Sequence, residues 1–270
     1  MKTFRTTIEL KKSEELITYK DKIMFFGSCF TDNIGNKFLN LCFNTIVNPF
    51  GVLYNPLSVS KNIKNLIEKK KYTESDIFYH NDQWRSFDHH GSFSHIEKNQ
   101  YLENINKNQE ESSKFIDNAS FLFITFGTAF VYNHKATNQI VANCHKIPDN
   151  EFNRELINVD SIINEYDDLI KRLIFENPKL KIVFTISPVR HWKDGAEQNN
   201  LSKSILKVSI DKICKQNPEA SYYPSYEIMM DDLRDYRFYK DDMLHPNNIA
   251  IEYIWNHFSD LFWLKYFTDY

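Results

Sequence analysis

The stretch KIMFFGSCFTDNIGN, residues 22–36, decides the fold. Its apolar run at 23–26 has the length and continuity of a strand buried on both faces of a parallel sheet. Gly27 ends the run, and a helix follows in which apolar residues recur at the spacing of one buried face. These residues are Ile34, Phe38 and Leu41. A strand, a glycine turn and a helix in this order place the turn at the carboxyl edge of the sheet, where open α/β proteins bind ligands.

Two candidate nucleophiles, Ser28 and Cys29, stand in this turn. Both would lie at the N-terminus of the helix, with Thr31 as its cap. The free N–H groups and the positive dipole end there favour a thiolate or a developing oxyanion. A structural role is the alternative, and on these residues alone the commoner one, because a Ser before a helix usually caps it and a single Cys is usually a small buried hydrophobe. Catalysis therefore requires a general base elsewhere in the chain.

Such a base is predicted in KDDMLHPNN, residues 240–248. Asp242 and His245 are three positions apart, just before Pro246, which we expect in the first turn of the last helix. A tight turn brings such a pair into contact, and a carboxylate on one imidazole nitrogen leaves the other free as a base. The alternative is an Asp that caps the helix beside an incidental His.

The composition of the chain limits its possible domain organisation, partners and cysteine chemistry. With 270 residues and 42% hydrophobic content, the chain can fold as one domain, 1–270, with a less regular insertion rich in His and aromatic residues near 72–95. A net charge of -3 and the lack of a Lys/Arg stripe argue against nucleic-acid binding. Without an apolar stretch of about 20 residues or a signal-peptide pattern, a cytoplasmic protein with no membrane contact is expected. The four cysteines show no C-x-x-C spacing and are predicted to be free thiols.

Apolar runs of strand length alternate with longer segments of 3.6-residue period, which predicts a mostly parallel five-stranded sheet covered by helices. The expected strands are 23–26, 43–47, 121–126, 182–186 and 221–223. The expected helices, besides the first and the last, are 57–70, 96–115, 160–176 and 198–215, with Asp160 as a cap. A short edge strand is expected over 4–10, and a hairpin that joins 129–132 to 140–142.

Further candidate site residues follow the predicted strands. Gly51 lies in the loop after the second strand, where a βαβ unit would turn its backbone toward Cys29, although ordinary turn chemistry also explains it. Arg190 could clamp a carboxylate or phosphate, or form a surface ion pair. The other candidates are Thr128, Asn143, His145 and His191. The histidines of 80–95 lack ligand partners of recognisable spacing, so a pocket wall or a lid is expected there, with no metal and no cofactor.

Five motifs together resemble the GSCFA family, a branch of the SGNH/GDSL hydrolase superfamily. They are GSCF (27–30), NCHK (143–146), SPVRH (187–191), YEIMMDDLRDYRFY (226–239) and DMLHP (242–246). The resemblance implies a flavodoxin-like, three-layer α/β/α fold and Ser-His-Asp hydrolase ancestry. An ungapped overlay puts Cys29 at the position of the nucleophilic Ser, Ser28 at that of the preceding Asp, and Gly51 at the second-block glycine. Asp242 and His245 match the last block, whereas 127–130 lacks the asparagine of the oxyanion hole.

The resulting hypothesis is an esterase-like hydrolase or acyltransferase that acts on an acyl ester of a small molecule or a carbohydrate through a covalent intermediate. Cys29 would attack, His245 would move the proton and Asp242 would orient His245. Backbone N–H groups of Cys29 and Gly51 would hold the oxyanion, with Thr128, Asn143 or His145 in place of the missing asparagine. Ser28 would serve if the turn were shifted. The alternative is a non-catalytic protein whose rim of Arg190, His191 and His145 binds a small anionic or carbohydrate ligand.

Overall fold

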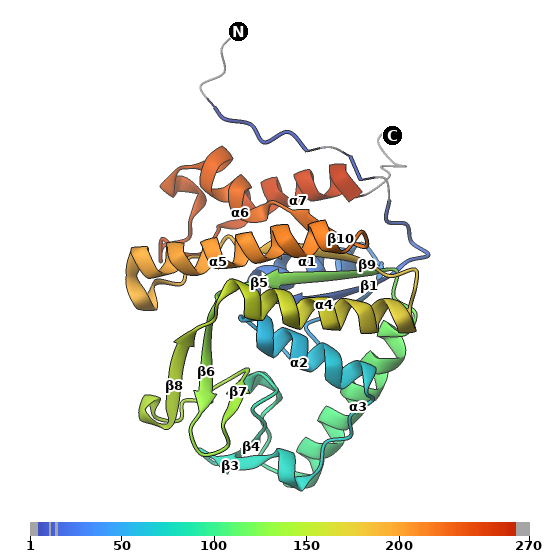
Figure 1. Ribbon diagram of the computed structural model, residues 1–270, viewed down its shortest axis with the longest axis vertical. Coiled ribbons are helices and arrows are strands. Elements are labelled where there is room, and N and C mark those ends of the chain that lie inside the picture. Colours follow the sequence, from blue (N-terminus) through green and yellow to red (C-terminus); the bar gives the residue numbers. More distant parts are fainter. Residues whose placement is uncertain (1–4, 11, 14–15, 263–270) are drawn as a thin grey trace.

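The computed structural model describes residues 5–10, 12, 13 and 16–262. A sheet of five parallel strands forms its centre, in the order β10-β9-β5-β1-β2 (Figure 1). The strands are β1 (Lys22–Gly27), β2 (Asn44–Val47), β5 (Phe121–Phe126), β9 (Lys181–Ile186) and β10 (Ala220–Tyr223). The predicted flavodoxin-like α/β/α class is confirmed, since each apolar run forms one central strand.

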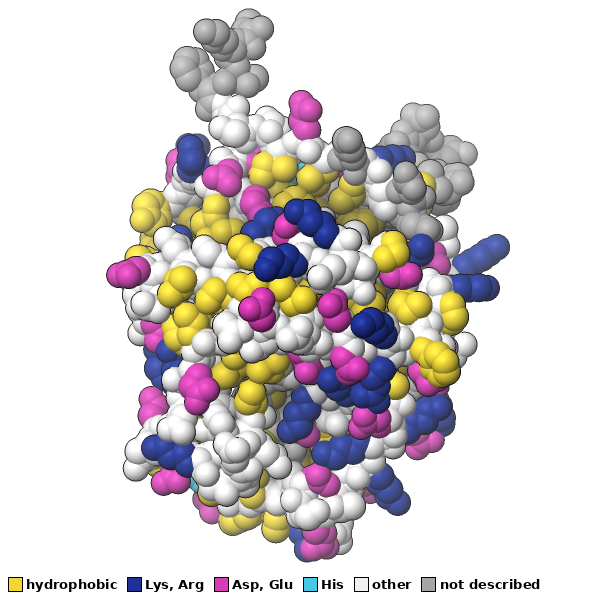
Figure 2. All heavy atoms as spheres, in the orientation of Figure 1, with side chains coloured by type: hydrophobic (Ala, Val, Ile, Leu, Met, Phe, Trp, Pro, Cys, Tyr) yellow, Lys and Arg dark blue, Asp and Glu magenta, His cyan; other side chains and the backbone are white. Residues whose placement is uncertain are grey.

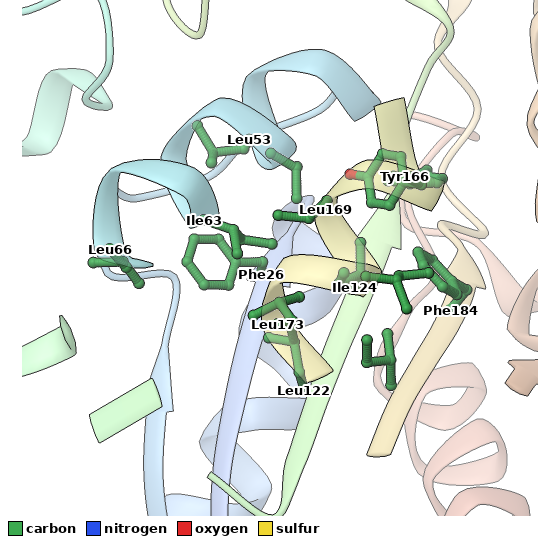
Figure 3. Packing of buried hydrophobic residues seen from close by; sticks show 14 of the residues in the cluster. Phe26, Leu53, Ile63, Leu66, Leu122, Ile124, Tyr166, Leu169, Leu173 and Phe184 are labelled. Carbon is green, nitrogen blue, oxygen red and sulfur yellow. The ribbon is translucent and has the colours of Figure 1, made fainter. Parts of the chain in front are cut away.

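Helices cover both faces of this sheet. One layer contains α2 (Pro56–Ile67), α3 (Lys98–Ile116), α4 (Val159–Glu176) and α5 (Gly195–Gln216), and the other contains α1 (Cys29–Asn40), α6 (Ser225–Glu227) and α7 (Asn248–Phe262). Alternate residues of β1 enter different cores: Met24 and Phe26 pack with the first layer, Ile23 and Phe25 with the second. Figure 3 shows Phe26, Leu122 and Phe184 of the strands against the side chains of α2 and α4. Burial on both faces explains the uninterrupted apolar runs.

Two small antiparallel sheets extend the molecule below this body (Figure 1). One pairs β3 (Phe78–His80) with β4 (Gln83–Arg85), and the other has the order β7-β6-β8, from β6 (Phe130–His134), β7 (Gln139–Val141) and β8 (Phe152–Leu156). The N–H of Ala142, just after β7, donates to the carbonyl of Phe87, just after β4, at 2.8 Å, and this hydrogen bond joins the two small sheets. The hairpin of β6 and β7 was predicted. Strand β8 was not predicted, and with it residues 130–156 form a three-stranded sheet beside the segment near 72–95.

Short helical turns complete the chain at Glu74–Asp76, Gly91–Phe93, Asp149–Glu151, Trp192–Asp194, Ile228–Leu233 and Tyr236–Phe238.

The edge strand expected over 4–10 is wrong for the described residues 5–10, which form no strand; Phe4 lies outside the described residues. Ile8 and Leu10 pack against the core of the second helix layer, and Arg5 forms an ion pair with Asp232. The alternation of Ile8 and Leu10 with polar residues therefore reflects packing on helices and loops, not sheet pairing.

Three helix starts also differ from expectation. Ser28, not Thr31, caps α1, because its Oγ accepts from the N–H of Phe30 at 3.3 Å. Asn158, not Asp160, caps α4. Pro246 precedes α7 and forms a bridge with Tyr239, while Asn247 accepts from the first turn of the helix.

The glycine turn after β1 permits one residue type only. Gly27 has φ +140°, and a Cβ added there would lie 2.2 Å from the carbonyl oxygen of Thr125. Its N–H donates to Asn48 Oδ1 at 2.8 Å, and its carbonyl accepts from Leu53 at 2.9 Å. The turn is therefore fixed by β1, β5 and the loop after β2 together.

The surface mixes both charge signs. On the face that Figure 2 draws, Lys and Arg side chains are interleaved with Asp and Glu. In the described part of the chain, every helix is too short or too polar to cross a membrane.

We predict that Gly35→Ala destabilises the fold by about 1–3 kcal/mol. Helix α1 approaches β2 so closely that a Cβ at residue 35 would lie 2.5 Å from Val47 Cγ2. Urea unfolding of the single variants and of Gly35→Ala/Val47→Ala tests this. Once Val47 is truncated, the same Ala should be neutral or stabilise by up to about 1 kcal/mol through its helix propensity. An equal loss in both backgrounds would contradict the close approach.

Candidate active site

The turn before α7 holds the Asp and His that the spacing singled out. Asp242 Oδ1 accepts from the N–H groups of Leu244 at 2.8 Å and His245 at 2.9 Å, and its Oδ2 lies 2.7 Å from His245 Nδ1. These hydrogen bonds lower the pKa of Asp242 to about 2. Because a carboxylate can only accept, Nδ1 carries the proton, and Nε2 of the neutral ring is left as the basic nitrogen.

Cys29 and His245 line one cavity of about 540 Å³, which we call the Cys29 cavity. Cys29 is the first residue of α1 and is half-buried. His245 is more than 200 positions away in sequence, and the 41% exposure of its side chain leaves the ring accessible. Within the described residues, no hydrogen bond joins the thiol to the ring. The fold therefore brings the predicted nucleophile and base to one cavity without an ion pair between them.

Burial raises the pKa of the Cys29 thiol, and the Asp32 carboxylate in the same helical turn raises it further. The N–H groups of Cys29 and Phe30 and the charge of Lys240 act in the opposite direction, but less strongly. The helix N-terminus therefore favours the thiolate, as expected, but burial and Asp32 outweigh it. At neutral pH the thiol keeps its proton, so a reaction at Cys29 needs a base.

Ser28 has no access to this cavity. It is fully buried, and its hydroxyl caps α1. Its N–H donates to the carbonyl of Thr125 at 3.3 Å. Of the two candidates in the turn, the geometry favours Cys29.

Gly51 does not act as the predicted oxyanion donor. Its N–H donates to the carbonyl of Asn48 at 2.7 Å, which closes a turn. Its α-carbon faces His90, whose Cβ would lie 2.3 Å from an added Cβ. The turn chemistry noted as the alternative accounts for this glycine.

Thr128 and Asn143 both line the Cys29 cavity. The hydroxyl of Thr128 is engaged, because it lies 3.1 Å from Ser202 Oγ and accepts from Phe130 N–H at 3.1 Å. The side chain of Asn143 uses its oxygen to accept from His145 N–H at 2.8 Å. Its NH₂ group has no acceptor within the described part of the chain, so Asn143 has the freer donor.

His145 is a structural residue, and its expected place at the site is wrong. Its buried ring lies outside the Cys29 cavity, with Nε2 2.8 Å from the Ser86 carbonyl and Nδ1 3.3 Å from the Arg85 guanidinium. A carbonyl accepts and a guanidinium donates, so Nε2 carries the only proton. Burial lowers the pKa of His145 to about 4 and keeps the ring neutral.

Arg190 and His191 line the Cys29 cavity but differ in charge. Burial, assisted by the Lys203 ammonium, lowers the pKa of His191 to about 3, so its ring is neutral. Of the rim predicted to bind an anionic or carbohydrate ligand, His145 therefore lies outside the cavity, and His191 lines it as a neutral ring. The Arg190 guanidinium lies 5.3 Å from the centre of the Trp192 ring.

Sequence reasoning missed several residues around this site. Asn48 links the glycine turn to Asp32, since its amide nitrogen lies 2.6 Å from Asp32 Oδ1. Tyr54 and the ion pair between Arg154 and Asp194 also line the cavity. Of these missed residues, only Asn48 had a recognisable signal in the sequence, because it begins the turn motif NPFG at residues 48–51.

Lys203 gave no signal in the sequence, because it stands in a polar stretch of helix. Its buried Nζ donates to the carbonyls of Gly127 and Ser187, both at 2.7 Å, and so ties the ends of β5 and β9 together. Burial lowers the pKa of Lys203 to about 7.

Within residues 16–262 and the described residues before them, no cluster of three or more His, Cys, Asp or Glu side chains could hold a metal ion. His89, from the His-rich segment, is fully buried among Phe50, Tyr72 and Phe93.

The model of the GSCFA family matches residues 22–258, from β1 through most of α7. The chain belongs to the GSCFA family. The match includes the glycine turn with Cys29 and the turn with Asp242 and His245, so both walls of the Cys29 cavity are GSCFA segments. No curated protein matches the chain.

Three solved structures are similar to this GSCFA chain at low sequence identity. A family 3 carbohydrate esterase from Talaromyces cellulolyticus is 10% identical, with a TM-score of 0.40 over 88% of this chain and 94% of that one. A family 3 carbohydrate esterase from Clostridium thermocellum is 11% identical, with a TM-score of 0.41 over 89% and 94%. The acetyl xylan esterase Est2A from Butyrivibrio proteoclasticus is 12% identical, with a TM-score of 0.47 over 91% of this chain and 64% of that one.

We predict that Asp32→Asn makes Cys29 more reactive at neutral pH. Removal of the carboxylate charge lowers the pKa of the thiol, and the amide oxygen can still accept from Asn48. Iodoacetamide labelling of Cys29 at pH 7, followed by mass spectrometry, should accelerate roughly three- to tenfold. Exposed Cys42 is the internal control, and an unchanged ratio of the two rates would contradict the role of Asp32.

Proposed function

We propose that the protein is an acyl-ester hydrolase or acyltransferase that works through a thioester on Cys29. One observation carries the proposal: Cys29, at the N-terminus of α1, and His245, held by Asp242, line the same cavity. Nucleophile, base and orienting carboxylate in one site are the arrangement for covalent acyl transfer. Family membership supports the hydrolase ancestry that the sequence motifs imply.

The reaction begins with the protonated thiol. As Cys29 Sγ bonds to the ester carbonyl carbon, the thiol proton moves to His245 Nε2, and the carbonyl oxygen becomes an oxyanion. Asp242 stabilises the imidazolium that forms. When the C–O bond breaks, His245 returns the proton to the leaving alcohol, and a thioester remains. Water, or another alcohol, then attacks the thioester while His245 takes its proton, and the acid or the new ester leaves as Cys29 regains its proton.

The oxyanion needs donors in place of Gly51. The N–H of Cys29 is at the free end of α1 and has no carbonyl partner among the described residues. We assign the second donor to the NH₂ group of Asn143, whose side chain is fixed through its oxygen. Loss of one such donor typically lowers turnover about 10²- to 10³-fold.

Cys29→Ala and His245→Ala should each lower hydrolysis of short acyl nitrophenyl esters by about 10²-fold or more, because one removes the nucleophile and the other the base. Cys29→Ser should retain slower turnover, since a hydroxyl is harder to deprotonate. Esterase assays with purified protein measure these rates, and Cys42→Ala, at an exposed thiol, is the matched control. Full activity in both the Cys29→Ala and His245→Ala variants would eliminate the mechanism.

Asn143→Ala should lower kcat about 10²-fold while KM changes little, since an oxyanion donor acts mainly in the transition state. Steady-state kinetics on the same ester measures both constants, with circular dichroism as the test of folding. A rise in KM at constant kcat would reassign Asn143 to substrate binding.

A further inference from the structure

A second cavity of about 430 Å³ adjoins the Cys29 cavity; we call it the Tyr239 cavity. The two share the residues Arg190, Trp192 and Leu244 as a common wall. The N–H of Arg190 donates to the carbonyl of Leu244 at 3.2 Å, which ties this wall to the turn that carries His245. The two cavities are therefore neighbours, and Arg190 lies at the boundary between them.

The carboxylates that line the Tyr239 cavity are already engaged by neighbouring side chains. Asp235 pairs with Arg237 at 2.8 Å, and Asp242 with His245 at 2.7 Å. Arg234, the other lining arginine, lies 3.6 Å from Asp231. Within the part of the chain that the structure describes, none of these carboxylates forms an ion pair with Arg190.

Arg190 itself has weak partners. One terminal nitrogen lies 3.3 Å from Asn200 Oδ1, and the other lies 3.8 Å from the sulfur of Met230. Its Nε is buried and has no partner among the residues that the structure describes. A partly desolvated guanidinium without a carboxylate is costly, and a ligand carboxylate, which matches its planar fork, would offset that cost.

The remaining lining fits a sugar ring. Trp192, Tyr236 and Tyr239 line the cavity, and Trp192 and Tyr236 are 47% and 75% exposed. Aromatic walls with a few well-placed polar groups are typical of small-molecule sites, and the volume is in the range of such sites. The apolar faces of a pyranose can pack on these rings while its carboxylate meets Arg190.

We propose that the Tyr239 cavity binds the acidic sugar part of the substrate ester, a uronic acid, with its carboxylate on Arg190. The proposal rests on the ester chemistry proposed above, and it makes Arg190 a specificity residue.

Two acetylated probes that differ in one group test this: an acetylated methyl glucuronoside and the matching methyl glucoside. The wild-type kcat/KM should favour the acidic probe about tenfold or more, the range of a charged hydrogen-bonded pair. Arg190→Gln should reduce this preference to about threefold or less, mainly through KM, and Arg190→Lys should retain part of it. Arg172→Gln, at an exposed arginine of α4 that pairs with Glu68, is the matched control and should keep the full preference.

A wild type that hydrolyses both probes equally well, or an Arg190→Gln variant that keeps the preference, would overturn the inference and leave the proposed function standing. If neither probe is turned over, titration calorimetry of the wild type with the unacetylated methyl glucuronoside decides separately. Binding that Arg190→Gln abolishes would support the subsite without the enzyme activity. Absence of binding to the folded protein would refute the subsite.

Discussion

The architecture depends on a close approach between two strands at Gly27. Only a residue without Cβ allows the Thr125 carbonyl to come so near β1, and the Asn48 amide and the Leu53 N–H then fix the turn from the other side. Ser28 is thereby buried as a helix cap, and the next residue, Cys29, reaches the cavity. The position of the thiol is thus set by the packing of the central strands together with the loop after β2, whose Asn48 and Leu53 hydrogen-bond to the turn.

The opposite wall comes from the other end of the chain. The turn before α7 is closed on itself by Asp242, which accepts two backbone N–H groups as well as the imidazole. Its attachment to the Arg190 backbone joins it to the end of β9. Lys203 in turn joins the ends of β9 and β5. A chain of hydrogen bonds at the carboxyl edge of the sheet therefore links the elements that carry Cys29 and His245, as preorganised chemistry requires.

Much of the fold could be read from the sequence, because strands buried on both faces must be continuous apolar runs. Three strands of the small sheets, β3, β4 and β8, carry no such signal; β8, for example, is short and contains Arg154 and Glu155. At the site, the Asp242 and His245 contact follows from spacing alone. Gly51 and His145 were misplaced because sequence indicates which residues share a loop but not which partner each N–H or ring nitrogen finds. The burial of Lys203 and the pKa of Cys29 depend on packing between distant segments, which single-residue patterns do not encode.

The raised pKa of Cys29 also has a consequence for redox chemistry. Peroxides oxidise thiolates far faster than thiols, so a cysteine that keeps its proton at rest is a poor substrate for sulfenic acid formation. Many nucleophilic cysteines exist as thiolates and depend on cellular reductants to stay functional. Here burial and the neighbouring Asp32 withhold the reactive form until a base removes the proton. The same packing that leaves the thiol dependent on a base therefore also makes it slow to oxidise.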